Sequence, residues 1–175
     1  MSENCLLKGT LIELENDKKI EIEKLKVGEK LLSYSINGIE NTQNFDILRN
    51  MKIDTFDGDF SYQLIKNIFK NTFEQYYNIN NKLFITEDHY IFCKRDSDDT
   101  TEYFWTLVEY LQVDDYLFKS DNTFEKIDSI DIVEEEQSVY NIEVNSIYTF
   151  FANGYLVHNG TACSQANCLA CYNAS

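Results

Sequence analysis

Hydrophobic residues along the chain fall in short groups that alternate with polar residues and are separated by turn-forming residues. Alternation with a period of two is typical of β-strands that bury one face. This alternation is clear in residues 19–22 and 125–133, and short apolar runs also favour strands at residues 10–14, 31–34, 82–86, 90–93, 116–118, 139–144, 149–152 and 155–157. Many short strands with frequent turns predict an all-β fold.

The turns must rely on Gly, Asn and Asp, because the sequence contains no proline. Asn37–Gly38 has the residues typical of a β-hairpin turn. Residues 40–59 are polar, and we assign no helix or strand to them. Residues 60–77 mix aromatic and polar residues and favour strands, whereas residues 106–111 favour one short helical turn.

One pattern occurs twice. Residues 25–32 and 111–118 both read Leu, any residue, Val, a turn residue, two further residues and then two apolar residues. A repeat separated by about half the chain indicates duplication and a pseudo-two-fold fold. Chance similarity between two strand entries is the alternative.

Length and charge narrow the class of protein. The 175 residues indicate one domain with a core of its own. The net charge of −15 argues against a nucleic-acid partner, which requires a basic surface. No apolar run reaches the ~20 residues that span a bilayer, and the first residues do not resemble a signal peptide. We therefore expect a cytoplasmic monomer with no membrane partner.

Candidate chemistry lies at both ends of the chain. An apolar segment, residues 155–157, leads to His158, Asn159 and Gly160, and His158 is one of only two histidines in the sequence. An asparagine followed by glycine is prone to attack its own backbone carbonyl, because glycine does not hinder ring closure. A neighbouring histidine can transfer the protons that this reaction needs. Cys5 supplies a nucleophile near the other end.

Four segments, in order, resemble the motifs of inteins and other Hint domains. They are residues 5–12, beginning with Cys5, residues 22–29, residues 85–92 with the pattern Thr-x-x-His, and residues 139–159, ending in His-Asn. The resemblance implies the all-β, horseshoe-like, pseudo-two-fold Hint fold. It also implies that residues 5–159 form the domain, with residues 1–4 and 160–175 as its flanking segments. That span leaves little room for a homing endonuclease, as in a mini-intein or a bacterial intein-like domain.

The resemblance implies two self-cleavage steps. Cys5 would attack the carbonyl of Asn4 and form a thioester, while His89 protonates the departing amide nitrogen and Thr86 holds the amide or its oxyanion. The Asn159 side chain would form a succinimide and break the bond to Gly160, assisted by His158. For these residues the alternatives are a buried structural cysteine, a surface strand end at residues 86–89 and an ordinary Asn-Gly turn.

Three residues depart from the family pattern. Gly160 stands where a splicing intein has Cys, Ser or Thr, so the usual acceptor for ligation is missing. Asn141 replaces a frequent Asp and cannot act as a carboxylate base. Tyr148 replaces a frequent His and is a weaker proton shuttle. We therefore expect cleavage at Asn159 more than splicing, with the thioester passing to water or to an external thiol or amine.

The cysteines leave a second possibility open. Cys163, Cys168 and Cys171 crowd the segment after Asn159 and would need a fourth ligand to bind zinc. A flanking segment with no metal is the simpler interpretation, and we expect no cofactor, with zinc left open as an inhibitor or as a ligand of these cysteines. The alternative functions are a decayed, non-catalytic Hint domain or thiol-rich zinc-binding module, and a thiol hydrolase acting in trans through Cys5 and His89.

Overall fold

The computed structural model describes residues 4–159 as an all-β domain with one short α-helix and two 3-10 helices. One sheet has the strand order β13 (Ile130–Val133), β7 (Tyr76–Ile79), β8 (Leu83–Ile85), β1 (Leu6–Leu7), β14 (Gln137–Val144), β6 (Gly58–Phe73) and β4 (Lys30–Ile36). The other has the order β12 (Phe124–Lys126), β11 (Tyr116–Phe118), β9 (Tyr90–Asp96), β16 (Tyr155–His158), β15 (Thr149–Ala152), β2 (Leu11–Glu13) and β3 (Lys19–Glu21), with β10 (Thr101–Leu107) and β5 (Lys52–Ile53) joined through β9. The predicted all-β class is confirmed.

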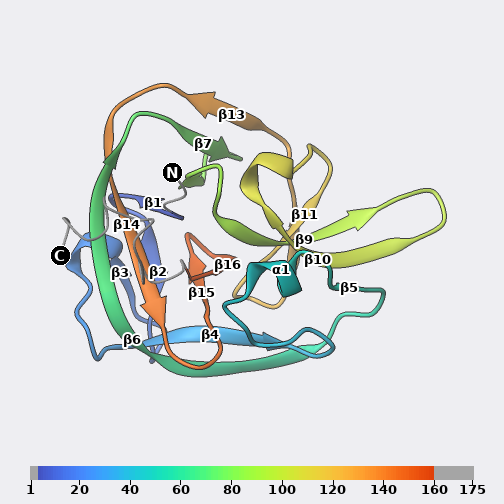
Figure 1. Cartoon of the computed structure of the whole chain (residues 1–175), viewed down its shortest axis with the longest axis horizontal. Coiled ribbons are helices and arrows are strands. Elements are labelled where there is room, and N and C mark those ends of the chain that lie inside the picture. The colour runs from blue at the N-terminus through green and yellow to red at the C-terminus, as the bar shows by residue number, and fades with distance from the viewer. Residues whose placement is uncertain (1–3, 160–175) are drawn as a thin grey trace.

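The long strand β6 borders the domain. It curves around one side of the molecule, with β4 along one end and β14 along the other, while the β9–β10 hairpin projects on the opposite side (Figure 1). The first and last strands, β1 and β16, lie inside this border. Both ends of the described residues thus lie next to central strands.

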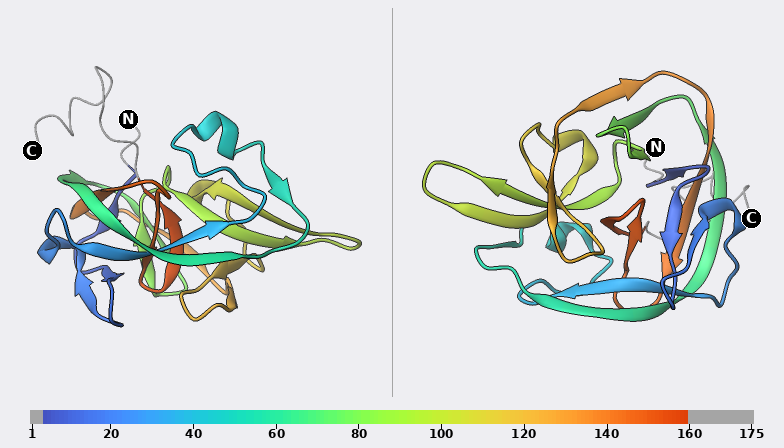
Figure 2. Two further views of the ribbon diagram at one scale, coloured as in Figure 1. Left: turned by 90° about the horizontal axis from the view of Figure 1, so that it is seen from below. Right: turned by 180° about the vertical axis from the view of Figure 1, so that it is seen from behind.

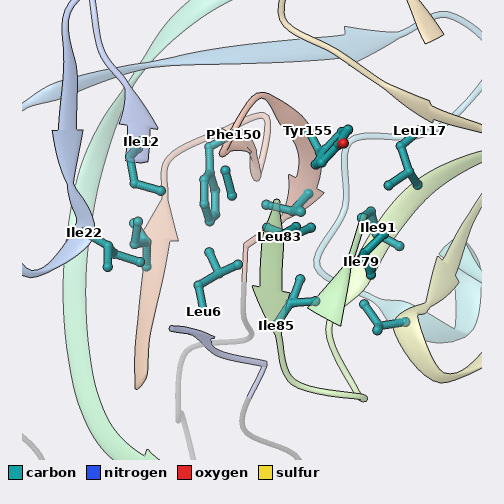
Figure 3. Packing of buried hydrophobic residues seen from close by; sticks show 14 of the residues in the cluster. Leu6, Ile12, Ile22, Ile79, Leu83, Ile85, Ile91, Leu117, Phe150 and Tyr155 are labelled. Atoms are coloured by element: carbon teal, nitrogen blue, oxygen red, sulfur yellow. The ribbon is translucent and has the colours of Figure 1, made fainter. Parts of the chain in front are cut away.

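The main core lies between these strands. It is built from aliphatic side chains of β1, β2, β8, β9 and β16 together with Phe150 of β15 (Figure 3). A second cluster is rich in aromatic rings and includes Tyr34, Phe92, Trp105, Phe118 and Phe151. Burial of these large rings contributes to hydrophobic stabilisation, and the cluster also includes Leu156 of β16.

The repeated sequence pattern has the same structure in both copies. A 3-10 helix lies directly before each copy, η1 (Ile22–Lys24) before the first and η2 (Val108–Tyr110) before the second. Each copy then leads into a strand, β4 in the first and β11 in the second. The turn residues Gly28 and Asp114 both have positive φ, 91° and 79°. Their N–H groups donate to equivalent carbonyl groups, those of Ile65 and Ile127. The shared hydrogen bonds agree with the predicted pseudo-two-fold fold rather than with chance similarity.

The Asn37–Gly38 turn does not close a hairpin, which corrects the prediction. β4 pairs with β6, and Ile36 lies opposite Gly58, so residues 37–57 form an excursion between two paired strands. This excursion carries α1 (Phe45–Leu48) and β5, and it projects from one side of the β layers (Figure 2). Although this segment is mostly polar, its Ile39 and Leu48 are buried and pack into the aromatic cluster.

Residues 125–133 do not form one strand, which is a second correction. β12 pairs with β11 in one sheet, and β13 pairs with β7 in the other. The chain bends between them because the Asn80 side chain accepts hydrogen bonds from the N–H groups of Asp128 and Ser129. Continuous alternation in the sequence therefore concealed a switch between sheets.

Candidate functional site

One turn between β8 and β9 contacts both ends of the described chain. This turn runs from Thr86 to His89, and both residues are buried, at 1% exposure each. Thr86 reaches Cys5, and His89 reaches His158. The structure thus brings together four of the predicted site residues, although they lie far apart in the sequence.

The Asn4–Cys5 amide is held by Thr86. The Cys5 N–H donates to Thr86 Oγ1 over 2.9 Å, and the Thr86 N–H donates to the Cys5 carbonyl over 3.0 Å. Thr86 Oγ1 also lies 3.0 Å from Asp88 Oδ1, which accepts from the Asn4 N–H at 3.2 Å. The hydroxyl proton can go to Asp88 Oδ1 or to the Cys5 carbonyl oxygen, 3.2 Å away, and in either case a lone pair of Oγ1 accepts the Cys5 N–H. Asp88 was not predicted as a site residue, although it stands inside the Thr-x-x-His motif.

Asn4 has an unusual conformation. Its φ is +40°, in the left-handed region that Asn tolerates better than most residues, and it is 4% exposed. Its side-chain Oδ1 is buried without a hydrogen-bond partner. The backbone just before Cys5 is therefore constrained by its surroundings.

His89 points one nitrogen at each part of the site. Nε2 lies 2.7 Å from the His158 carbonyl oxygen, and Nδ1 is buried without a hydrogen-bond partner. Burial lowers the pKa of His89 to about 4, against a weaker opposing effect of its carbonyl contacts and Asp88. At neutral pH the ring is therefore neutral and can accept a proton at Nδ1.

His158 contacts the backbone carbonyl of Asn159, which is the group that the Asn159 side chain would attack. Its Nδ1 lies 2.9 Å from the Asn159 carbonyl oxygen, and its Nε2 lies 2.8 Å from the Thr42 carbonyl oxygen. Burial also lowers the pKa of His158 to about 4. The rings of Phe45 and Trp105 lie edge-on to it, each with a centroid distance of 5.4 Å. Thr42 and Phe45 were not predicted, because nothing in the polar segment 40–59 indicates that it covers β16.

Asn159 is 1% exposed and is held by backbone groups. Its N–H donates to the Tyr148 carbonyl over 2.7 Å, and its Nδ2 donates to the Val144 carbonyl over 3.3 Å. Its Oδ1 is buried without a partner. Nδ2 must therefore leave Val144 before it can attack the Asn159 carbonyl carbon.

Two of the three residues that depart from the family pattern, Asn141 and Tyr148, lie near these groups. Asn141 is buried on β14, and β1 pairs with β14 so that Leu6 lies opposite Tyr140. One further step in this antiparallel register places Cys5 beside Asn141. Tyr148 has a φ of +64°, and its ring lies 6.3 Å from the His158 ring, centroid to centroid. The contact of Tyr148 with Asn159 is made by its carbonyl.

The remaining predicted residues lie outside the described part of the chain. These are Gly160 and the cysteines Cys163, Cys168 and Cys171. Within residues 4–159, no group of three or more His, Cys, Asp or Glu side chains is arranged to hold a metal. In the same residues, no helix has the length and apolar character needed to cross a bilayer.

Solved structures of similar shape identify the fold. A bacterial intein-like domain from Clostridium thermocellum matches with a TM-score of 0.66 and 18% identity, over 90% of this chain and 100% of that one. The chain has the Hint fold of inteins. The DnaB intein from Synechocystis sp. PCC 6803 matches this Hint fold with a TM-score of 0.61 and 16% identity, over 89% and 98% of the two chains.

The gp41-1 intein also shares the Hint fold. It matches with a TM-score of 0.58 and 20% identity, over 90% of this chain and 100% of that one. Because these inteins are covered almost completely, the described residues correspond to a Hint domain without an inserted endonuclease. No protein-family model and no curated protein matches the sequence.

Proposed function

We propose that the chain is a self-processing domain that cleaves its own backbone after Asn4 and after Asn159. The observation that carries the proposal is the turn from Thr86 to His89, which contacts Cys5 on one side and His158 on the other. The Hint fold of proteins described as inteins supports action on flanking segments of the same chain. Residues 1–4 and 160–175 are then the segments released.

The first step would convert the Asn4–Cys5 amide into a thioester. His89 Nδ1 takes the proton of the Cys5 thiol, and the thiolate sulfur attacks the Asn4 carbonyl carbon. The bond between the Asn4 carbonyl carbon and the Cys5 nitrogen then breaks, while the new bond from that carbon to the Cys5 sulfur remains. His89 returns the proton to the Cys5 nitrogen, which leaves as an amine. Water, an external thiol or an external amine then releases residues 1–4 from the sulfur.

The second step would break the Asn159–Gly160 bond. Asn159 Nδ2 attacks the Asn159 carbonyl carbon and closes a succinimide while it gives up one proton, and the Gly160 nitrogen takes up one proton and leaves as an amine. When His158 carries a proton on Nδ1, this N–H polarises the carbonyl oxygen, from which Nδ1 lies 2.9 Å away, and stabilises the negative charge that develops there. Gly160 offers no side-chain nucleophile, which favours cleavage over ligation.

Burial of the nucleophile favours action in cis. Cys5 is 2% exposed, so a second protein has little access to its thiol. This argues against a thiol hydrolase acting in trans. The zinc-binding alternative depends on Cys163, Cys168 and Cys171, which lie outside the described residues.

Mass spectrometry of the intact chain tests the proposal. We expect loss of the 16 residues 160–175 with time, and release of residues 1–4 when thiol is added. Asn159→Ala should stop the first change without stopping the second, and Cys5→Ala should do the reverse. A chain whose mass stays constant for days with added thiol would overturn the proposal.

A further inference from the structure

The proton of His89 can be located from its partner. His89 Nε2 lies 2.7 Å from the carbonyl oxygen of His158, and a carbonyl oxygen can only accept. A neutral His89 ring therefore carries its proton on Nε2 and its lone pair on Nδ1. Among residues 4–159, Nε2 makes the close hydrogen bond of this ring, whereas Nδ1 has no partner within hydrogen-bond geometry.

The carbonyl that accepts this bond belongs to the peptide group joining His158 to Asn159. The N–H of the same peptide group donates to the Tyr148 carbonyl over 2.7 Å. Tyr148 aims that carbonyl from a left-handed conformation, with φ at +64°, which is costly for a residue with a Cβ atom. The peptide group is thus held on one edge by a side chain and on the other by a strained backbone.

The orientation of this peptide group controls the geometry of cyclisation. It fixes the backbone on the N-terminal side of Asn159, and so limits where the Asn159 side chain and carbonyl can lie relative to each other. His158, on the other side of the same peptide, must keep Nδ1 at the Asn159 carbonyl oxygen. A rotation of the peptide would disturb both contacts.

We propose that His89 is also a positioning residue for the C-terminal step: its Nε2–H holds the His158–Asn159 peptide group in the orientation from which Asn159 cyclises. One side chain then serves both cleavages, with Nδ1 facing the N-terminal step and Nε2 the C-terminal step. This inference rests on the proposed function, because it requires cleavage after Asn159.

The test separates the two roles of His89. In a chain carrying Cys5→Ala, which cannot form the thioester, we compare the rate of loss of residues 160–175 with and without a second change at His89. His89→Leu removes the donor, leaves the His158 carbonyl unpaired and should slow the loss by about tenfold. His89→Gln keeps an N–H donor of similar reach and should stay within about threefold of the Cys5→Ala rate.

The same two substitutions in the chain with Cys5 give the matched control. Glutamine cannot take the thiol proton, so both variants should lose the thiol-induced release of residues 1–4. A rescue by glutamine at one end only is not expected of a merely structural residue. Equal rates of tail loss for His89→Leu and the Cys5→Ala parent, or equal slowing by both substitutions, would overturn the inference while leaving the proposed function intact.

A parent that never loses its tail would contradict both the proposed function and the inference. Nitrogen NMR of the Cys5→Ala, Asn159→Ala chain gives a second readout that needs no variant at His89. We expect the shift of a protonated nitrogen at Nε2 and of an unprotonated nitrogen at Nδ1. The opposite tautomer at neutral pH would overturn the inference even if His89→Leu failed to fold.

Discussion

The Thr42 carbonyl oxygen lies 2.8 Å from Nε2 of His158, whose Nδ1 faces the Asn159 carbonyl oxygen at 2.9 Å. Both partners can only accept, whereas a neutral imidazole has a single N–H. The neutral ring therefore donates to one carbonyl at a time, and only the protonated ring donates to both. The excursion between β4 and β6 thus competes with the Asn159 carbonyl for the proton of His158.

Opening this excursion should raise the pKa of His158. The Phe45 ring stacks on Tyr90 and lies edge-on to His158, and burial is the largest cause of the low pKa, about 4. Phe45→Ala admits water to the ring and should move the pKa towards its ordinary value of about 6.5. An NMR titration of the Cys5→Ala, Asn159→Ala chain measures it. Phe124→Ala, which removes a ring that packs on Phe56 and Phe118, is the control. An unchanged His158 pKa in the Phe45 variant would refute this assignment of the cause.

The two histidines should make the fold sensitive to mild acid. Burial lowers the pKa of His89 and His158 from 6.5 to about 4, so the unfolded chain binds more protons between these values. Their stability contribution is complete above pH 6.5 and is lost as the pH falls towards 4, with a slope of at most about 2.7 kcal/mol per pH unit for two protons. Urea unfolding of the same inactive chain between pH 7.5 and 5 measures this slope. The window stays above the range in which ordinary carboxylates titrate.

A chain with both histidines replaced is the control for that experiment. His89→Gln together with His158→Gln should give a nearly constant free energy of unfolding across the window, since the sequence contains no other histidine. An equally steep slope in this double variant would assign the acid sensitivity to other groups.

The sequence was sufficient for the strands that carry the chemistry and for the repeat. Short apolar runs predict β14, β15 and β16, and the repeated pattern predicts two equivalent turns at Gly28 and Asp114. These features are encoded locally, in apolar spacing and in residues that tolerate positive φ. Cys5, His89 and His158 could also be identified from the sequence, because each lies in a segment that resembles a Hint motif.

Other contacts depend on tertiary structure and leave no local signal. The Thr42 contact with His158 is made by a backbone carbonyl, which any residue could supply. The switch between sheets after β12 depends on Asn80, which is distant in the sequence. Asp88 is intermediate: its place in the Thr-x-x-His motif was visible, but its hydrogen bonds to Thr86 and Asn4 were not.

The repeat supplies a matched pair for measuring a buried charge. Asp115 accepts the Gln112 N–H and pairs with Arg95 through two hydrogen bonds of 2.8 Å each, with its side chain 3% exposed. Its counterpart Glu29 accepts the Lys26 N–H at the surface. Asp115→Ala leaves Arg95 without its partner and should cost about 3 kcal/mol, whereas Glu29→Ala should cost less than about 1 kcal/mol. Urea unfolding at pH 7.5 compares them, and equal losses would contradict the assigned difference in burial and pairing.

The Thr86 hydroxyl should matter for the N-terminal step and little for the C-terminal one. Its oxygen accepts the N–H of the amide to be broken and lies 3.0 Å from Asp88 Oδ1, whereas its described contacts include none with His158 or Asn159. Thr86→Val keeps the shape and removes the hydroxyl, so thiol-induced release of residues 1–4 should slow by about 10- to 100-fold. Thr86→Ser keeps the hydroxyl and should remain within about fivefold of the parent.

Release is followed by mass spectrometry in an Asn159→Ala chain, and tail loss is followed separately in a Cys5→Ala chain. If valine slows both ends equally, Thr86 supports the turn as a whole, and its hydroxyl has no specific part in thioester formation.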